Sequence, residues 1–179
     1  MQTGELDTNL PWMTKEIINA MCYRDKIVKD HDMDSLFQLT DNADFSIALH
    51  EILNNQCDYN PDTLNFVQRV LFLCMHIENA GQADHILSFL QEEFPNYADE
   101  TVKALYEIGA EKSAEIIKKA IELLPKNGTW FFKIADENSQ NLMGKLDREF
   151  SNYPDGSMRD LYRKYAEKHR SDLCVGLNL

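Results

Sequence analysis

The stretch from Phe66 to Ile77 constrains the fold most strongly, because it places apolar residues on nearly every side of a helix. Its apolar residues include Phe66, Val70, Leu71, Leu73, Cys74 and Ile77. Asn60-Pro61-Asp62 provides a capping side chain, a proline for the first helical position and an acid for the helix dipole. Asn79-Ala80-Gly81 provides a turn at the other end. The sequence therefore predicts a central buried helix over residues 61–78.

The rest of the chain carries apolar residues at helical spacing and predicts helices packed around the central one. Thr14 is placed to cap a helix over 12–29, and Gly109 is placed as a left-handed helix stop. Because alternating β patterns are missing between the turns, we expect an all-α fold of about eight helices in a single compact domain. The expected boundaries are a flexible N-terminal arm (1–11), one helical domain (12–174) and a C-terminal tail (175–179).

The composition fits one soluble domain, since 179 residues with 44% apolar content are enough for a hydrophobic core. The apolar runs are shorter than a membrane span requires, and the first residues lack the features of a signal peptide. Four widely separated cysteines (Cys22, Cys57, Cys74 and Cys174) indicate reduced thiols. These observations predict a cytoplasmic protein without membrane association.

The negative charge is concentrated in one region of the sequence. Residues 30–102 contain fourteen carboxylates and one cation, Arg69, so this stretch carries −13 of a chain whose net charge is −12. The rest of the sequence is nearly balanced. A charge asymmetry of this kind bears on the partners of a protein rather than on its fold.

Carboxylates in this stretch are candidates for imitating DNA phosphates. Side chains three or four positions apart on a helix lie roughly 6 Å from each other, close to the spacing of neighbouring phosphates. The predicted partner-binding residues are Asp30, Asp32, Asp34, Asp41, Asp44, Glu51, Asp58 and Asp62. A solvated acidic face is the alternative interpretation, because the buried central helix accounts for part of the shortage of cations.

Patterns for metal sites and catalysis are incomplete. Asp30-x-Asp32-x-Asp34 begins like a calcium-binding EF-hand loop, but Ser35 occupies the glycine position and Asp41 the position of the bidentate glutamate. His50-Glu51-Ile52-Leu53-Asn54 has asparagine where a zinc protease needs its second histidine. The sequence predicts neither a catalytic site nor a metal or cofactor, and its acidity argues against direct nucleic-acid binding.

Three segments resemble one protein family. They are Phe66–Gly81, Tyr97–Ala114 and Leu146–Phe150, with Ala104–Ala110 the most specific part. Together they are similar to the family of DNA-mimic protein nineteen, an acidic all-helical DNA mimic grouped with a domain of unknown function, over roughly residues 60–170. The resemblance implies an all-α fold, dimerisation and occupation of the DNA-binding face of a transcription factor. The match is broken after Asn79, where Ala80, Gln82, Asp84 and His85 depart from the family pattern.

Two hypotheses follow from the sequence. The first is a non-enzymatic DNA-mimic regulator, acting as a homodimer, that blocks a basic DNA-binding protein, specifically a helix-turn-helix transcription factor. The second is a helical protein-interaction or immunity-type module whose acidic face only keeps it soluble.

Overall fold

The structure is a computed structural model that describes residues 13–177. Every regular element within these residues is helical, so the predicted all-α fold class is confirmed. The α-helices are α1 (Lys15–Asp30), α2 (Met33–Gln38), α3 (Asn42–Cys57), α4 (Phe66–Ala83), α5 (Ala98–Glu107), α6 (Glu111–Leu123), α7 (Phe131–Ile134), α8 (Glu137–Ser151), α9 (Met158–Lys168) and α10 (Arg170–Leu173). Shorter segments with other hydrogen-bond patterns are η1 (Pro61–Thr63), η2 (Ser88–Glu93) and η3 (Pro95–Tyr97).

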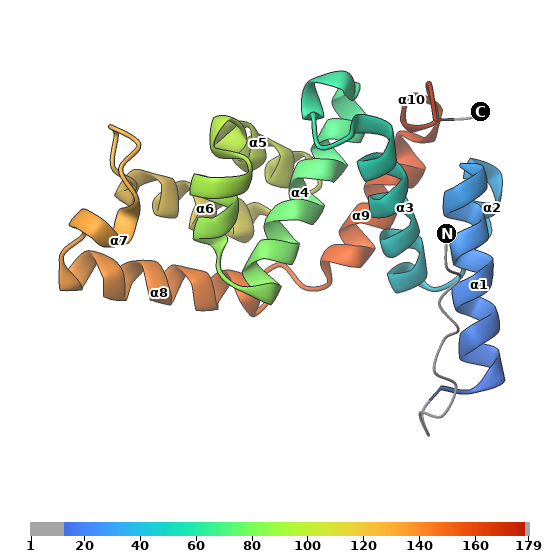
Figure 1. The fold of residues 1–179 in the computed structure, drawn as a ribbon, viewed down its shortest axis with the longest axis horizontal. Helices are drawn as coiled ribbons and strands as arrows, with labels where there is room; N and C mark the ends of the chain where they lie inside the picture. Colours follow the sequence, from blue (N-terminus) through green and yellow to red (C-terminus); the bar gives the residue numbers. More distant parts are fainter. Residues whose placement is uncertain (1–12, 178–179) are drawn as a thin grey trace, which may run out of the picture.

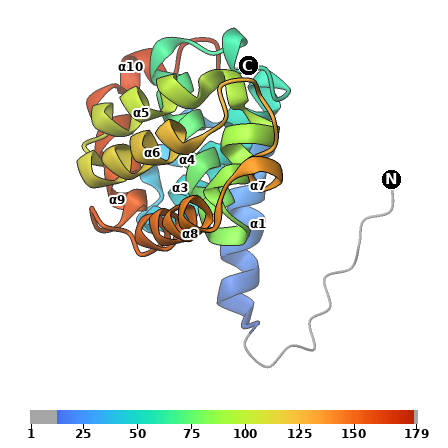
Figure 2. The same ribbon diagram turned by 90° about the vertical axis from the view of Figure 1, so that its left-hand side faces the viewer.

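The helices form one elongated body with α4 in its middle (Figure 1). Helices α1–α3 share one end of the body with α9 and α10, and α6–α8 occupy the other end. The view turned by 90° shows α1 projecting beyond the other helices (Figure 2). The last helices of the chain therefore return to the first ones, and α9 packs against α3.

Helix α4 is the predicted central helix, but its start differs from the prediction. Pro61 begins a separate 3₁₀ turn capped by Asn60, and the chain is extended again at Leu64. The α-helix begins at Phe66 behind a capping box, in which Asn65 and Gln68 satisfy each other's backbone N–H groups. The prediction of a helix over 61–78 was therefore wrong at its start, because a second helix cap, at Asn65, follows the one at Asn60.

The predicted end of the central helix was also wrong, because α4 continues through Gly81 to Ala83. Gly81 lies inside the helix and faces α8. A Cβ added there would lie 2.8 Å from Cδ1 of Phe150. This glycine therefore serves close packing between α4 and α8 rather than a turn.

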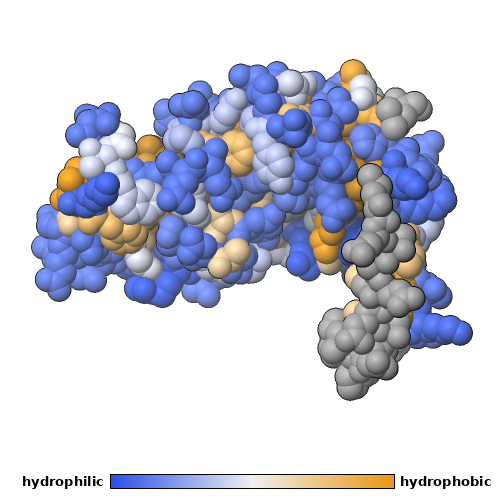
Figure 3. Space-filling model, viewed as in Figure 1, coloured by the Kyte–Doolittle hydropathy of each residue, from blue (hydrophilic) through white to orange (hydrophobic). Residues whose placement is uncertain are grey.

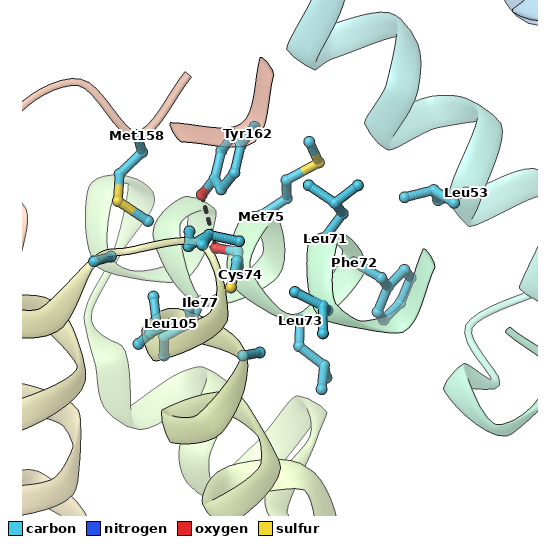
Figure 4. Packing of buried hydrophobic residues seen from close by; sticks show 14 of the residues in the cluster. Leu53, Leu71, Phe72, Leu73, Cys74, Met75, Ile77, Leu105, Met158 and Tyr162 are labelled. Carbon is cyan, nitrogen blue, oxygen red and sulfur yellow. Dashed lines mark hydrogen bonds between the residues drawn. The ribbon is translucent and has the colours of Figure 1, made fainter. Parts of the chain in front are cut away.

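The core surrounds α4, whose residues Leu71–Cys74 are all fully buried. In Figure 4, Leu53 of α3, Leu105 of α5 and Tyr162 of α9 approach α4 from different sides. Outside this core the surface in Figure 3 is mostly hydrophilic, with some apolar side chains near α7. No helix among residues 13–177 has both the length and the apolar content needed to cross a membrane.

The predicted domain boundaries fall at the edges of the described chain. The expected arm, 1–11, lies outside the described residues. At the other end, Leu177 is fully buried, and the carbonyl of Val175 accepts a hydrogen bond of 2.8 Å from the side chain of Gln68. The first residues of the expected tail thus pack on α4.

The turn between α8 and α9 caps α6 across the fold. Ala110, which precedes α6, has no side-chain oxygen to accept from the first turn of the helix. Asp155 performs this role, accepting from the backbone N–H groups of Lys112 (3.0 Å) and Ser113 (2.7 Å) and from the Ser113 hydroxyl (2.7 Å). The turn at 154–156 therefore fixes the start of a helix more than forty residues earlier.

We expect Asp155→Ala to lower the free energy of unfolding by about 1–2 kcal/mol, because the first turn of α6 loses its acceptor. Urea denaturation measures this loss. Asp155→Asn, which keeps one acceptor oxygen, should lose less than the alanine variant. Equal stability of wild type and Asp155→Ala would show that water replaces the cap without cost.

Candidate functional site

Asp30, Asp32 and Asp34 lie at the junction of α1 and α2, where His31 takes a left-handed conformation. The ammonium of Lys26 lies 2.6 Å from the Asp30 carboxylate. Asp32 is the N-cap of α2 and accepts from the backbone N–H and hydroxyl of Ser35, and these hydrogen bonds lower the pKa of its carboxyl. These contacts explain the helix break without a calcium ion.

Asp41 and Asp44 lie at the first turn of α3. Asp41 is the N-cap and accepts from the backbone N–H groups of Ala43 (2.7 Å) and Asp44 (3.0 Å). Asp44 is half-buried and forms an ion pair of 3.2 Å with Arg24 of α1. Both residues therefore help to position α3, besides contributing negative charge.

Glu51, Asp58 and Asp62 lie along and beyond α3. Glu51 is exposed and has no ion-pair partner within residues 13–177. Asp58 ends α3 in a left-handed conformation (φ 45°). Asp62 lies 3.8 Å from Arg69, whose guanidinium also contacts Glu100 at 2.6 Å.

The eight predicted residues thus lie on α1–α3, on η1 and in the loops beside them, and do not form one cluster. Asp41 and Asp58 lie at opposite ends of α3, whose sixteen residues span about 24 Å. Asp32 and Asp44 are half-buried, and the other six are exposed.

Two arginines from the far end of the sequence enter the acidic region. Arg170 of α10 contacts Asp34 at 2.7 Å, and its guanidinium lies over the ring of Phe37. Arg163 of α9 donates to the backbone carbonyls of Phe37 and Leu39. The folded region is therefore less negative than residues 30–102 are in the sequence, because contacts of this range cannot be read from local charge counts.

A polar cavity of about 370 Å³ opens between α3, α4, α9 and the α8–α9 turn. Its lining includes Glu51, Glu78, Tyr153, Arg159 and Tyr162. Glu78 is nine-tenths buried, and the Tyr162 hydroxyl donates to its carboxylate at 2.8 Å. Burial raises the pKa of the Glu78 carboxyl. Sequence patterns do not reveal this site, because Glu78 and Tyr162 are 84 positions apart.

A second cluster of polar side chains lies between α3 and α4. It consists of His50 and His76, with the side chain of Asn54 between them. The Asn54 amide oxygen lies 2.9 Å from Nε2 of His76, and its amide nitrogen lies 3.4 Å from Nε2 of His50. Burial lowers the pKa of His76 to about 3, and also lowers the pKa of His50. Among residues 13–177 no group of His, Cys, Asp or Glu side chains is arranged to hold a metal ion.

These features describe an acidic, all-helical protein. Its charged side chains contribute both to a negative surface and to contacts between helices. A family model described as DMP19-like protein matches residues 62–169, which is more than half of the chain. The protein therefore belongs to the DMP19-like family, and the resemblance noted in the sequence is confirmed. No curated protein and no solved structure gives a match.

Proposed function

We propose that this protein is a non-enzymatic DNA mimic that occupies the basic DNA-binding surface of a transcription factor and blocks its DNA binding. The observation that carries this proposal is membership of a family named for DNA mimic protein 19, in a chain with a strongly acidic N-terminal half. The proposed partner is a helix-turn-helix protein, and the proposed mimic acts as a homodimer in the cytoplasm.

The arrangement of the exposed acids supports this proposal. The distance of about 24 Å along α3, between Asp41 and Asp58, equals roughly seven base pairs of duplex at 3.4 Å each. A protein that contacts DNA phosphates over less than one helical turn could therefore meet carboxylates along a similar length. Asp30 and Asp34 add charge at the neighbouring α1–α2 junction.

The ion pairs within this region are compatible with partner binding. The side chains of Asp34 and Asp62 are 88% and 73% exposed, although they contact Arg170 and Arg69. Exposed ion pairs contribute only about 0–1 kcal/mol, so a lysine or arginine of a partner can compete for these carboxylates.

The same contacts favour the alternative function, a helical interaction module whose acids only keep it soluble. Arg24, Arg69 and Arg170 offset part of the negative charge in the folded chain. A competition experiment separates the two functions, since a soluble interaction module has no reason to displace DNA.

Four exposed acids that do not cap a helix N-terminus provide the test. The variant combines Asp30→Asn, Asp34→Asn, Asp58→Asn and Asp62→Asn, and asparagine suits the left-handed conformation at position 58. Wild-type protein should release DNA from helix-turn-helix proteins in a gel-shift panel at low salt. The variant should need at least about tenfold more protein for the same release, because four phosphate surrogates are lost.

A matched control removes the same charge from α5, α6 and α8, at positions outside residues 30–102. It combines Glu107→Gln, Glu122→Gln, Glu137→Gln and Glu149→Gln, all at exposed positions. The control should displace DNA like the wild type, and displacement by both should weaken steeply as salt rises. Absence of displacement by the wild type at low salt across the panel would reject DNA mimicry in favour of the interaction module.

A further inference from the structure

The polar cavity between α3, α4, α9 and the α8–α9 turn is built around a buried carboxylate. Glu78 of α4 lines this cavity, and a second cavity of about 520 Å³ shares Glu78, Tyr153 and Arg159 with it. The Tyr162 hydroxyl donates a hydrogen bond to one oxygen of the Glu78 carboxylate. The volume of about 370 Å³ lies in the range of small-molecule sites.

The charges that face the cavity are unequal. Glu78 and Glu51 contribute two carboxylates, and Arg159 contributes one cation. His50, which also lines the cavity, is kept neutral because burial lowers its pKa. The lining therefore holds one more carboxylate than cations. Burial makes ionisation of Glu78 costly, so a further positive group beside it would favour its ionised form.

Part of the cavity lining is apolar. Ile47 of α3 and Met75 of α4 contribute hydrocarbon surface beside the carboxylates. Asn79 and Gln82 add amide groups that can donate or accept hydrogen bonds. A ligand that fits these walls has a positive end and a short alkyl chain.

We propose that this cavity binds a guanidinium or ammonium group carried on a short alkyl chain, with Glu78 as its inner and Glu51 as its outer carboxylate partner. The ligand can be a free small molecule or an arginine or lysine side chain presented by a protein. An anion is disfavoured by the two carboxylates, and a metal ion by the shortage of ligands, since no suitable group of His, Cys, Asp or Glu exists within the described residues.

The test uses butylguanidinium as the probe and butylurea as a neutral molecule of nearly the same shape, each titrated into the full chain by calorimetry. The charged probe should bind at least about tenfold more tightly than the neutral one. A capped Gly-Arg-Gly peptide forms the second arm, and it distinguishes a side chain on a protein from a free ligand. Binding of either cationic probe supports the cavity as a cation site.

Three variants locate the binding. Glu78→Gln should lower the affinity for butylguanidinium at least about tenfold, and Glu51→Gln should lower it several-fold. Glu92→Gln, an exposed acid outside the cavity, should bind like the wild type. Glu51 is exposed, so its variant keeps the test decisive even if Glu78→Gln unfolds.

The inference is overturned if neither cationic probe binds, if butylurea binds equally well, or if Glu51→Gln and Glu92→Gln bind like the wild type. It does not rest on DNA mimicry, because the titration contains no DNA-binding protein. The variant with four substitutions used in the gel-shift test keeps Glu51 and Glu78. The two proposals can therefore fail separately.

Discussion

Replacing Tyr162 with phenylalanine should lower the free energy of unfolding by about 1.5–3 kcal/mol, the range for hydrogen bonds to a charged group in a protein. The Tyr162 hydroxyl is fully buried and contacts the Cys74 carbonyl at 3.0 Å (Figure 4). It also contacts the Glu78 carboxylate at 2.8 Å. Phenylalanine keeps the ring packing but leaves a nine-tenths buried carboxylate without this donor. Urea denaturation at pH 7.5 measures the loss.

The neighbouring Tyr165 provides a matched control. Its hydroxyl is buried but has no hydrogen-bond partner within residues 13–177, and burial raises its pKa to about 12. Tyr165→Phe should therefore leave the stability unchanged or raise it, because an unsatisfied polar group is removed. Equal losses in Tyr162→Phe and Tyr165→Phe would show that ring packing, rather than the contact with Glu78, sets the cost.

A double variant tests whether charge is the cause. Combining Tyr162→Phe with Glu78→Gln should cost clearly less than the sum of the single variants, because a neutral amide tolerates the loss of a donor better than a carboxylate does. Additive effects would mean that the hydroxyl and the carboxylate act independently.

The helical fold could be predicted because its causes are local. Apolar spacing identified α4 as the central helix, and Thr14 and Gly109 mark helix ends in the structure as predicted. The start of α4 could not be predicted as well, because Asn60-Pro61 and the Asn65–Gln68 box are both valid start signals. Choosing between them depends on tertiary packing, since α4 is fixed by the Gln68 side chain, which donates to the carbonyls of Leu173 and Val175.

The arrangement of charges could be predicted only in part. The sequence identifies the acids, but several of the cations that meet them come from outside the acidic stretch, as Arg24 and Arg170 show. The polar cavity depends on residues from α3, α4 and α9, which no local pattern connects. Side chains that meet across more than eighty positions are determined by topology, and helix periodicity alone does not give the order in which helices pack.

Acid should destabilise this protein through His76, well before its exposed carboxylates are protonated. His76 is buried among Phe72, Phe94 and His50, and burial lowers its pKa to about 3, against 6.5 for an ordinary histidine. Below pH 6.5 His76 binds a proton in the unfolded chain, but in the folded chain it stays neutral down to about pH 3. The free energy of unfolding therefore falls as the pH falls. The expected loss relative to pH 7.5 is about 2 kcal/mol at pH 5 and about 3 kcal/mol at pH 4.

The contact between Asn54 and His50 is a second reason why stability should fall as the pH falls. The Asn54 amide nitrogen donates toward Nε2 of His50, so protonation of His50 at that nitrogen would place two N–H groups against each other. The raised pKa of Glu78 acts in the opposite sense, because its protonation in the folded state adds stability as the pH falls through that pKa. Comparison with a variant is therefore needed to isolate the histidine contribution.

His76→Gln removes the titrating group and keeps an amide that can reach Asn54. Urea denaturation of wild type and variant at pH 7.5, 6 and 5 should show a smaller loss of stability in the variant, by about 2 kcal/mol at pH 5. His169→Gln, outside the buried pair, should lose stability with acid as the wild type does. If wild type and His76→Gln lost stability equally between pH 7.5 and 5, proton uptake at His76 would not be the cause. Hydrogen exchange along α4 at each pH would then show whether the α3–α4 contact opens before the rest of the fold.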